Sequence, residues 1–160
     1  MQYFDQSLAE QTFAATGSTL RREVDSAEPR LRGLSEDRAG RSPAANKWSP
    51  KQVLGHLIDS AANNHQRFIR LQGTDDLRLP GYAQEFWVDT QHYSERAWLE
   101  LIELWCAYNR HLAHVIALIP EAKRHVYCQI GDGPRVTLSH IALDYVGHLQ
   151  HHLKQIFQPP

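Results

Sequence analysis

The sequence predicts an all-α protein, an up-and-down bundle of four long helices with an extra short helix or loop between the second and the third. Three observations predict this fold. Apolar residues recur at helical spacing over long segments, residues that begin or end helices flank those segments, and no convincing strand pattern is present. The length of 160 residues fits one helical-bundle domain, residues 1–160.

The first helix is predicted from Tyr3 to about Leu34, where apolar residues can form a stripe along one side. Gly17 and Pro29 are expected to weaken or break this helix, because neither residue suits a helix interior. Residues 36–46 are polar and include a glycine and a proline, so they are predicted to form a connection.

The second helix is predicted from Pro50 to about Gln72. Ser49 can cap its free N–H groups, Pro50 suits the first helical position, and Gly73 ends the helix. The residues that would form its buried face are Leu54, Leu57, Ile58, Ala61, His65, Phe68 and Ile69. Residues 73–93 are predicted to be a loop with one short helical turn.

The third helix is predicted from Ser94, as its cap, to about Ile119, with Pro120 as the stop. Residues 130–134 are predicted to form a turn because they contain two glycines and a proline. The fourth helix is predicted to begin after Thr137 as its cap and to end before Pro159.

Composition and charge exclude several classes of protein. The 17 basic and 18 acidic side chains give a formal charge of -1, which argues against a nucleic-acid-binding protein. No signal peptide and no apolar run long enough to span a membrane is present. Cys106 and Cys128 form neither a disulfide framework nor a CxxC motif, so a cytoplasmic location is expected.

Histidine is over-represented, with ten residues in the chain, and it is the commonest metal ligand in proteins. On a helical wheel, His152 and His148 lie about 60° and 100° to the same side of Leu149, the centre of the apolar face. Histidines at this i, i+4 spacing can present two imidazoles to one ion. Such a pair alone is more often a packed or solvated pair. His140 and His151 fall on the opposite, solvent side.

A third ligand would have to come from another helix. His56 lies about 160° from the centre of the apolar face of the second helix. That polar side is either solvated or lines a polar cleft, and periodicity alone favours the solvated surface. The other polar residues there are Asp59, Ser60, Asn63 and Arg67. His65 is expected to be a hydrogen-bonded core histidine, and His111 and His114 are expected to be solvated.

Three blocks of sequence together resemble the DinB/YfiT-like superfamily of bacterial metal-binding four-helix bundles. The first is Trp48-Ser49-Pro50 followed by a helix with His56. The second comprises residues 80–87, PGYAQEFW, with residues 104–112. The third is residues 144–156, which contain the HxxxH pair. The resemblance covers residues 48–156, whereas residues 3–46 carry no motif.

The resemblance implies a metal site made by His56, His148 and His152. The implied cofactor is a divalent ion, with Zn or Ni first and Fe, Mn or Cu as alternatives. Imidazole ligands suit Zn, Ni, Cu and Fe. Four further residues become candidates for contacts with the metal ligands or with a substrate, namely Asp59, Asn63, Arg67 and Tyr145. The resemblance also points to a homodimer.

Three neutral imidazoles leave a divalent ion with its full charge and an open position, which is typical of catalytic sites. The resemblance implies a metal-dependent hydrolase acting on a small molecule. One alternative is a metal-dependent S-transferase that uses a low-molecular-weight thiol. The thiol would be a cosubstrate, because neither cysteine of the chain lies near the proposed ligands in sequence. The other is a noncatalytic metal-binding or ligand-binding module, which a fourth protein ligand or a pocket filled by Trp87 or Tyr145 would favour.

Overall fold

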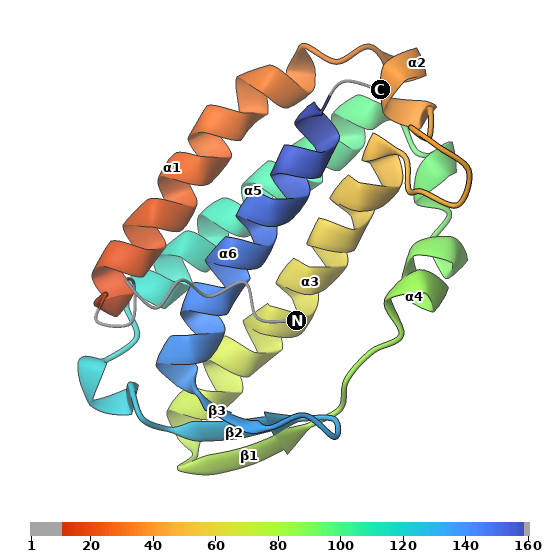
Figure 1. Ribbon diagram of the computed structural model, residues 1–160. Helices are drawn as coiled ribbons and strands as arrows, with labels where there is room; N and C mark the ends of the chain where they lie inside the picture. Colours follow the sequence, from red (N-terminus) through yellow and green to blue (C-terminus); the bar gives the residue numbers. More distant parts are fainter. Residues whose placement is uncertain (1–10, 159–160) are drawn as a thin grey trace.

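The computed structural model describes residues 11–158 and confirms the four-helix bundle (Figure 1). Its long helices are α1 (Phe13–Arg32), α3 (Pro50–Arg70), α5 (Trp98–Ala117) and α6 (Leu138–Phe157). The short helices are α2 (Glu36–Gly40) and α4 (Gln84–Thr90). The 3₁₀ turns that follow α3, α4 and α5 are, in that order, η2 (Leu71–Gly73), η3 (Tyr93–Glu95) and η4 (Glu121–Lys123). The extra short helix between the second and third long helices is therefore present as α4. The beginning of the predicted first helix, before residue 11, lies outside the described residues.

The directions of the long helices add a detail that the sequence does not show. In Figure 1, α1 and α6 run one way, and α3 and α5 both run the other way. The first turns of α3 and α5 lie at the same end of the bundle, because Lys51 Nζ donates to the carbonyl of Ser94 at 3.4 Å. The connection over residues 71–97 returns along the bundle, and this return gives neighbouring helices α3 and α5 the same direction.

Helix α1 is continuous through both residues that were expected to break it. A Cβ on Gly17 would lie 2.5 Å from the carbonyl oxygen of Ala113, so glycine permits the close approach of α1 and α5. Pro29 lies in the last turn of the helix, where the missing N–H costs a single hydrogen bond. The expectation of a break is therefore wrong at both positions.

Two of the three predicted helix caps are confirmed. The Ser49 side chain accepts from the backbone N–H of Gln52, and the Gln52 side chain accepts in return from the backbone of Ser49. Thr137 caps α6. Ser94 does not cap α5, which begins at Trp98 without a side-chain cap from its own N-cap residue. The backbone N–H of Trp98 donates instead to Glu36 in α2, at 3.0 Å, and this long-range contact replaces the local cap.

The expectation that no strands are present is wrong, because the structure contains a small three-stranded sheet. Its strands are β1 (Asp76–Leu79), β2 (Tyr127–Ile130) and β3 (Arg135–Thr137), in the order β1-β2-β3. Strand β1 is parallel to β2, and β2 is antiparallel to β3 across the predicted turn, where Gly131 has a φ of 54°. The strands are too short for a periodic pattern, and the partner of β1 is far away in sequence. The sheet closes the end of the bundle opposite α2 (Figure 1).

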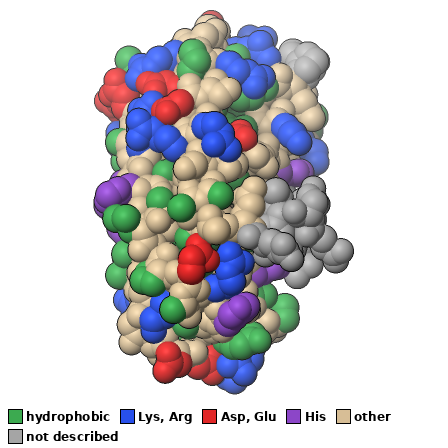
Figure 2. All heavy atoms as spheres, turned by 90° about the vertical axis from the view of Figure 1, so that its left-hand side faces the viewer, with side chains coloured by type: hydrophobic (Ala, Val, Ile, Leu, Met, Phe, Trp, Pro, Cys, Tyr) green, Lys and Arg blue, Asp and Glu red, His purple; other side chains and the backbone are tan. Residues whose placement is uncertain are grey.

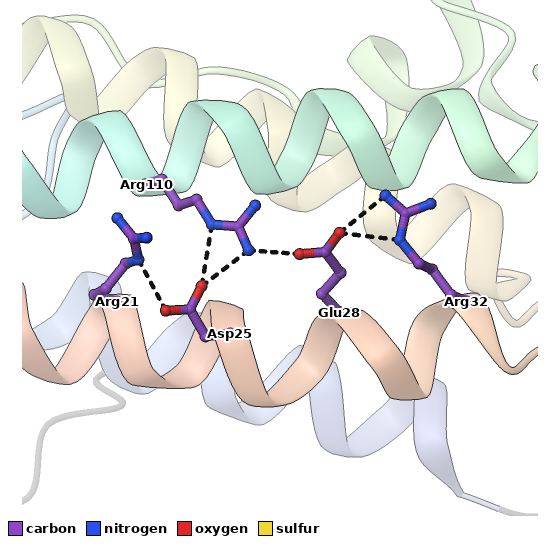
Figure 3. Close-up of polar contacts among 5 residues, drawn as sticks. All are labelled: Arg21, Asp25, Glu28, Arg32 and Arg110. Carbon is purple, nitrogen blue, oxygen red and sulfur yellow. Dashed lines mark hydrogen bonds and ion pairs between the residues drawn. The ribbon is translucent and has the colours of Figure 1, made fainter.

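Charged side chains of both signs are interspersed on the face of the molecule shown in Figure 2. In the residues that the structure describes, no helix has the length and hydropathy needed to cross a membrane. Figure 3 shows a charge network between α1 and α5, in which Arg110 of α5 contacts both Asp25 and Glu28 of α1. Hydrogen bonds from Arg21 and Arg110 lower the pKa of Asp25, and those from Arg110 and Arg32 lower the pKa of Glu28.

We expect Arg110→Met to lower the melting temperature at pH 7 by a few degrees. Exposed ion pairs contribute about 0.2–1 kcal/mol each, and 1 kcal/mol corresponds to about 2–4 °C at this size. The two carboxyl groups have a lower pKa in the folded protein, so their contribution is complete above the unfolded-state pKa of about 4 and is lost as the pH falls through the folded-state values. Thermal denaturation between pH 7 and pH 3 measures the effect.

The difference between Arg110→Met and the wild type should therefore shrink at low pH. Arg21→Met is the matched control, because it removes the exposed contact with Asp25 and leaves the contacts of Arg110 in place. A difference in melting temperature that stays constant from pH 7 to pH 3 would contradict the assignment.

Candidate metal centre

Three histidines from two antiparallel helices meet in the half of the bundle nearest α2. His56 lies two turns into α3, and His148 and His152 lie one turn apart in the second half of α6. Their ligand nitrogens all lie within 4.8 Å of one another. The Nε2 atoms of His56 and His148 are 3.0 Å apart. The structure thus brings together the three residues that the resemblance singles out, and no fourth His, Cys, Asp or Glu within residues 11–158 joins the group.

His56 is completely buried, with 0% of its surface exposed. The prediction from periodicity that His56 lies on a solvated surface is therefore wrong. The ring of Trp48 lies 5.2 Å from that of His56, and the rings of His148 and His152 lie 5.0 and 4.8 Å away. The polar side of α3 is covered by α6 and by the residue that precedes the Ser49 cap, and this packing makes it an interior surface.

Burial keeps the imidazoles neutral at pH 7. It lowers the pKa of His56 to about 4 and that of His148 to about 2, and a charge on His152 would lower both further. Burial also lowers the pKa of His152. Metal ions bind the neutral form of histidine, because only this form has a free lone pair on a ring nitrogen. The three side chains are therefore held in the protonation state that a metal ion requires.

Two of the rings are oriented by contacts through their second nitrogen. His152 Nδ1 lies 2.9 Å from Gln155 Oε1, and His148 Nδ1 lies 3.4 Å from Ser60 Oγ. Metal-bound histidines commonly use the second ring nitrogen in this way. His56 Nδ1 is buried without a hydrogen-bond partner in the described part of the chain.

The separation of the nitrogens also suits an ion. Zn–N distances of 2.0–2.1 Å in a tetrahedral site place neighbouring ligand nitrogens roughly 3.3 Å apart, close to the 3.0 Å between His56 and His148. The donor set therefore fits a divalent metal. The sequence reasoning missed Ser60 and Gln155 as contacts of the ligands, although they lie four and three residues after His56 and His152, which places each on the same side of its helix as a ligand.

Asp59 and Asn63 make contacts within α3 and with the connection that follows α4. Asp59 is buried, and its Oδ1 accepts from the hydroxyl of Tyr93 at 2.7 Å and from Nε2 of Gln91 at 2.6 Å. Burial raises the pKa of Asp59. Asn63 donates to the backbone carbonyl of Asp59. These contacts attach the η3 region to the helix that carries His56.

Tyr145 is buried and donates its hydroxyl to Asn109 of α5, which directs this hydroxyl toward α5. Arg67 is partly buried and donates to Oδ1 of Asn64 at 3.1 Å. Both residues line a cavity that also reaches His148. Of the four candidates, one therefore anchors a neighbouring segment (Asp59), one bonds within its own helix (Asn63), and two line a cavity (Arg67 and Tyr145).

Two cavities reach the histidine cluster from different sides. The His152 cavity, of about 970 Å³, lies between residues 35–48 and the end of α6 and includes His152 and Gln155 in its wall. The His148 cavity, of about 400 Å³, is enclosed by α3, α6, the loop that starts at Gly81 and the turn between β2 and β3. Trp87 lines neither cavity. Each cavity therefore reaches one histidine of the cluster, and the His148 cavity is the size of a small-ligand site.

His140 is partly buried and lines the His148 cavity, which corrects its predicted place on the solvent side. Sequence periodicity places it opposite the apolar face of α6, but the turn between β2 and β3 covers that side. His65 is partly buried and hydrogen-bonded to the hydroxyl of Tyr108 at 3.2 Å. His111 and His114 are exposed, as predicted.

Both cysteines are buried thiols, and neither lines a cavity that reaches the cluster. Burial raises the pKa of Cys106 to about 11 and also raises that of Cys128. The thiolate is the reactive form of cysteine. Neither side chain is therefore a nucleophile for chemistry at the cluster.

Comparison with known proteins agrees with this architecture. A family model described as the DinB superfamily matches residues 19–156, a range that includes all three clustered histidines. Among solved structures, the chain is similar to YfiT from Bacillus subtilis, which is described as a probable metal-dependent hydrolase with an unusual four-helix bundle topology. The TM-score is 0.81 at 17% identity, over 95% of this chain and 87% of that one, a likeness of fold. No curated protein matches the chain.

Proposed function

Because this chain belongs to the DinB superfamily, we propose that it is a metal-dependent hydrolase that acts on a small molecule. The observation that carries the proposal is the cluster of His56, His148 and His152, whose neutral imidazoles converge and two of which each line a cavity. The similarity to YfiT supports the same class of activity. The proposed cofactor is a divalent ion, with Zn or Ni first and with Fe, Mn or Cu compatible.

The three imidazoles would hold the ion, and Gln155 and Ser60 would fix two of the rings. When bound, a divalent ion in such a site acts as a Lewis acid and lowers the pKa of coordinated water toward about 7. Trp48 covers one side of His56 and excludes water from it. Asp59, held by Tyr93 and Gln91, positions the connection between α4 and α5 against α3. These roles leave the side of the cluster toward the cavities for a substrate.

A metal-dependent S-transferase with a low-molecular-weight thiol is the second candidate. The observation that favours it is the presence of two separate cavities at one cluster, because a transferase needs room for two reactants. Since neither cysteine lines the His152 cavity or the His148 cavity, the thiol would be a cosubstrate. A noncatalytic binding module is less well supported, because no fourth ligand from the described residues closes the site. The homodimer and the cytoplasmic location stay predictions from the sequence.

A substrate screen with controlled metal content tests the proposal. We expect metal-depleted protein to regain hydrolysis of activated esters or amides when Zn or Ni is restored, with a rate increase of about 100-fold or more. His56→Ala, loaded under the same conditions, should stay at the metal-free rate. Product formation that requires glutathione, bacillithiol or mycothiol would favour the transferase. Equal rates for metal-free, metal-loaded and His56→Ala protein would contradict both activities.

A further inference from the structure

The His148 cavity contains a row of polar side chains from α3. Ser60, Asn64 and Arg67 lie four, eight and eleven residues after His56, the spacing of one helical face. All three line the cavity, and His148 forms part of the wall across from them on α6. The polar face that carries His56 therefore continues from the histidine cluster into this cavity and ends at Arg67.

Arg67 carries its positive charge into the cavity and forms no ion pair with an acidic side chain of the described residues, although Asp144 lies in the same wall. Of its five N–H donors, the structure shows one in use, to Oδ1 of Asn64. No Asp or Glu among residues 11–158 forms an ion pair with it, whereas Arg110 and Arg124, also not fully exposed, each contact an acidic side chain. A partly buried charge is costly unless it is paired and hydrogen-bonded. The unused donors of Arg67 therefore suit a ligand with negatively charged oxygens.

The remaining wall of the cavity is compatible with such a ligand. Burial raises the pKa of Tyr82 to about 12, so its hydroxyl stays neutral and can donate a hydrogen bond. Burial lowers the pKa of Arg67, and the charge of Asp144, the acidic residue of the wall, acts in the opposite direction. The guanidinium is charged at neutral pH in any case.

Arg67 and the histidine cluster are close enough to act on one small molecule. Both Arg67 and His148 line the same space of about 400 Å³. A small ligand held by Arg67 in this cavity would therefore present its other end to His148. The geometry fixes a direction, with the charged end at Arg67 and the reacting end at the cluster.

We infer that the substrate carries a carboxylate or phosphate group, which Arg67 binds in the His148 cavity while the neutral, reacting end of the molecule lies at His148. The planar guanidinium matches either group through two parallel hydrogen bonds. This inference rests on the proposed function for the reaction, but the binding of the anion depends on Arg67 alone. It can therefore be tested without turnover.

Binding of small anions to the full chain tests the inference. We expect butyrate or inorganic phosphate, titrated by calorimetry, to bind wild-type protein, while uncharged butyramide does not bind. The preference between the two anions identifies the group. Arg67→Met should weaken anion binding by about 10- to 100-fold, the range for loss of hydrogen bonds to a charged group. Arg67→Lys, which keeps the charge, should bind with intermediate affinity and serves if the methionine variant does not fold.

The titration is repeated in the His56→Ala background to separate Arg67 from any metal, because anions also ligate metal ions. Anion binding should survive there and still depend on Arg67. Arg70→Met is the matched control, because Arg70 is exposed and lies about one turn after Arg67 in α3. This variant should bind the anion as the wild type does. Equal affinity of wild type, Arg67→Met and Arg67→Lys would overturn the inference and leave the metal site intact. If the wild-type protein binds the anion but binds no metal, that result would count against the proposed hydrolase activity and not against the anion site.

Discussion

Replacing His56 with alanine should weaken metal binding by about 100-fold or more. Four-ligand zinc sites bind with about 10–16 kcal/mol, or roughly 3 kcal/mol for each ligand, which corresponds to about two orders of magnitude in affinity. His148→Ala and His152→Ala should have the same effect, because the three nitrogens converge on one point. Metal content of protein prepared without a histidine tag, followed by competition with a chelating dye, measures the loss.

The same prediction has a readout in stability. A ligand at 1,000 times its dissociation constant stabilises the folded state by about 4 kcal/mol, which is roughly 8–16 °C for a chain of this length. At that metal concentration the wild type should gain this increase, while a variant with 100-fold weaker binding should gain only about 1.4 kcal/mol, or roughly 3–6 °C. His114→Ala, in an exposed position of α5, is the control that should behave as the wild type. Three variants with wild-type affinity would show that the cluster is not the metal site.

Gly55→Ala should be among the most destabilising single methyl additions in the protein. A Cβ at this position would lie 2.2 Å from Cδ2 of Tyr93, and two further atoms of the same ring would be closer than 3 Å. Tyr93 is 6% exposed and donates to Asp59, so its ring has little room to move. Overpacking of this kind costs about 1–3 kcal/mol or more, which corresponds to a decrease of roughly 2–12 °C in melting temperature. Thermal and urea denaturation measure it.

The clash should also reach the metal site, because Gly55 precedes His56 in α3. A displaced helix would move the His56 imidazole away from the two ligands on α6, and we expect a lower metal affinity in the variant that folds. Gly40→Ala is the matched control: no atom lies within 4 Å of its added Cβ, and alanine in a helix stabilises by up to about 1 kcal/mol relative to glycine.

Tyr93→Leu in the Gly55→Ala background should recover part of the lost stability, because the two residues share one space. A double-mutant cycle would give this coupling directly. Full stability of Gly55→Ala, or strict additivity of the two changes, would contradict the assignment of the contact between α3 and Tyr93.

The sequence by itself determined the long helices and those helix ends at which a nearby side chain caps the backbone. Ser49 and Thr137 form caps where they were expected, since capping depends on a side chain and a backbone group within the same turn. The HxxxH pair was also predictable, because i, i+4 residues on a helix share a face. Ser94 failed as a cap, because the first N–H groups of α5 were satisfied from α2 rather than locally.

The third histidine was the part of the candidate site that periodicity misjudged. A helical wheel gives the angle between His56 and the apolar residues of its own helix, but it does not show what packs on the polar side. That side is covered by α6 and Trp48, so a residue that reads as solvated is fully buried. His56 was predicted as the third ligand from the resemblance to a family, and not from the periodicity of its helix.

Only the tertiary structure decided how distant segments meet. The pairing of β1 with β2 joins Asp76 to Tyr127, and no local window of sequence contains both. The same closure of the bundle end places Tyr82 and the turn after β2 against α3 and α6, and so creates the His148 cavity around Arg67. Local interactions set the helices, whereas the site depends on which polar faces the packing encloses.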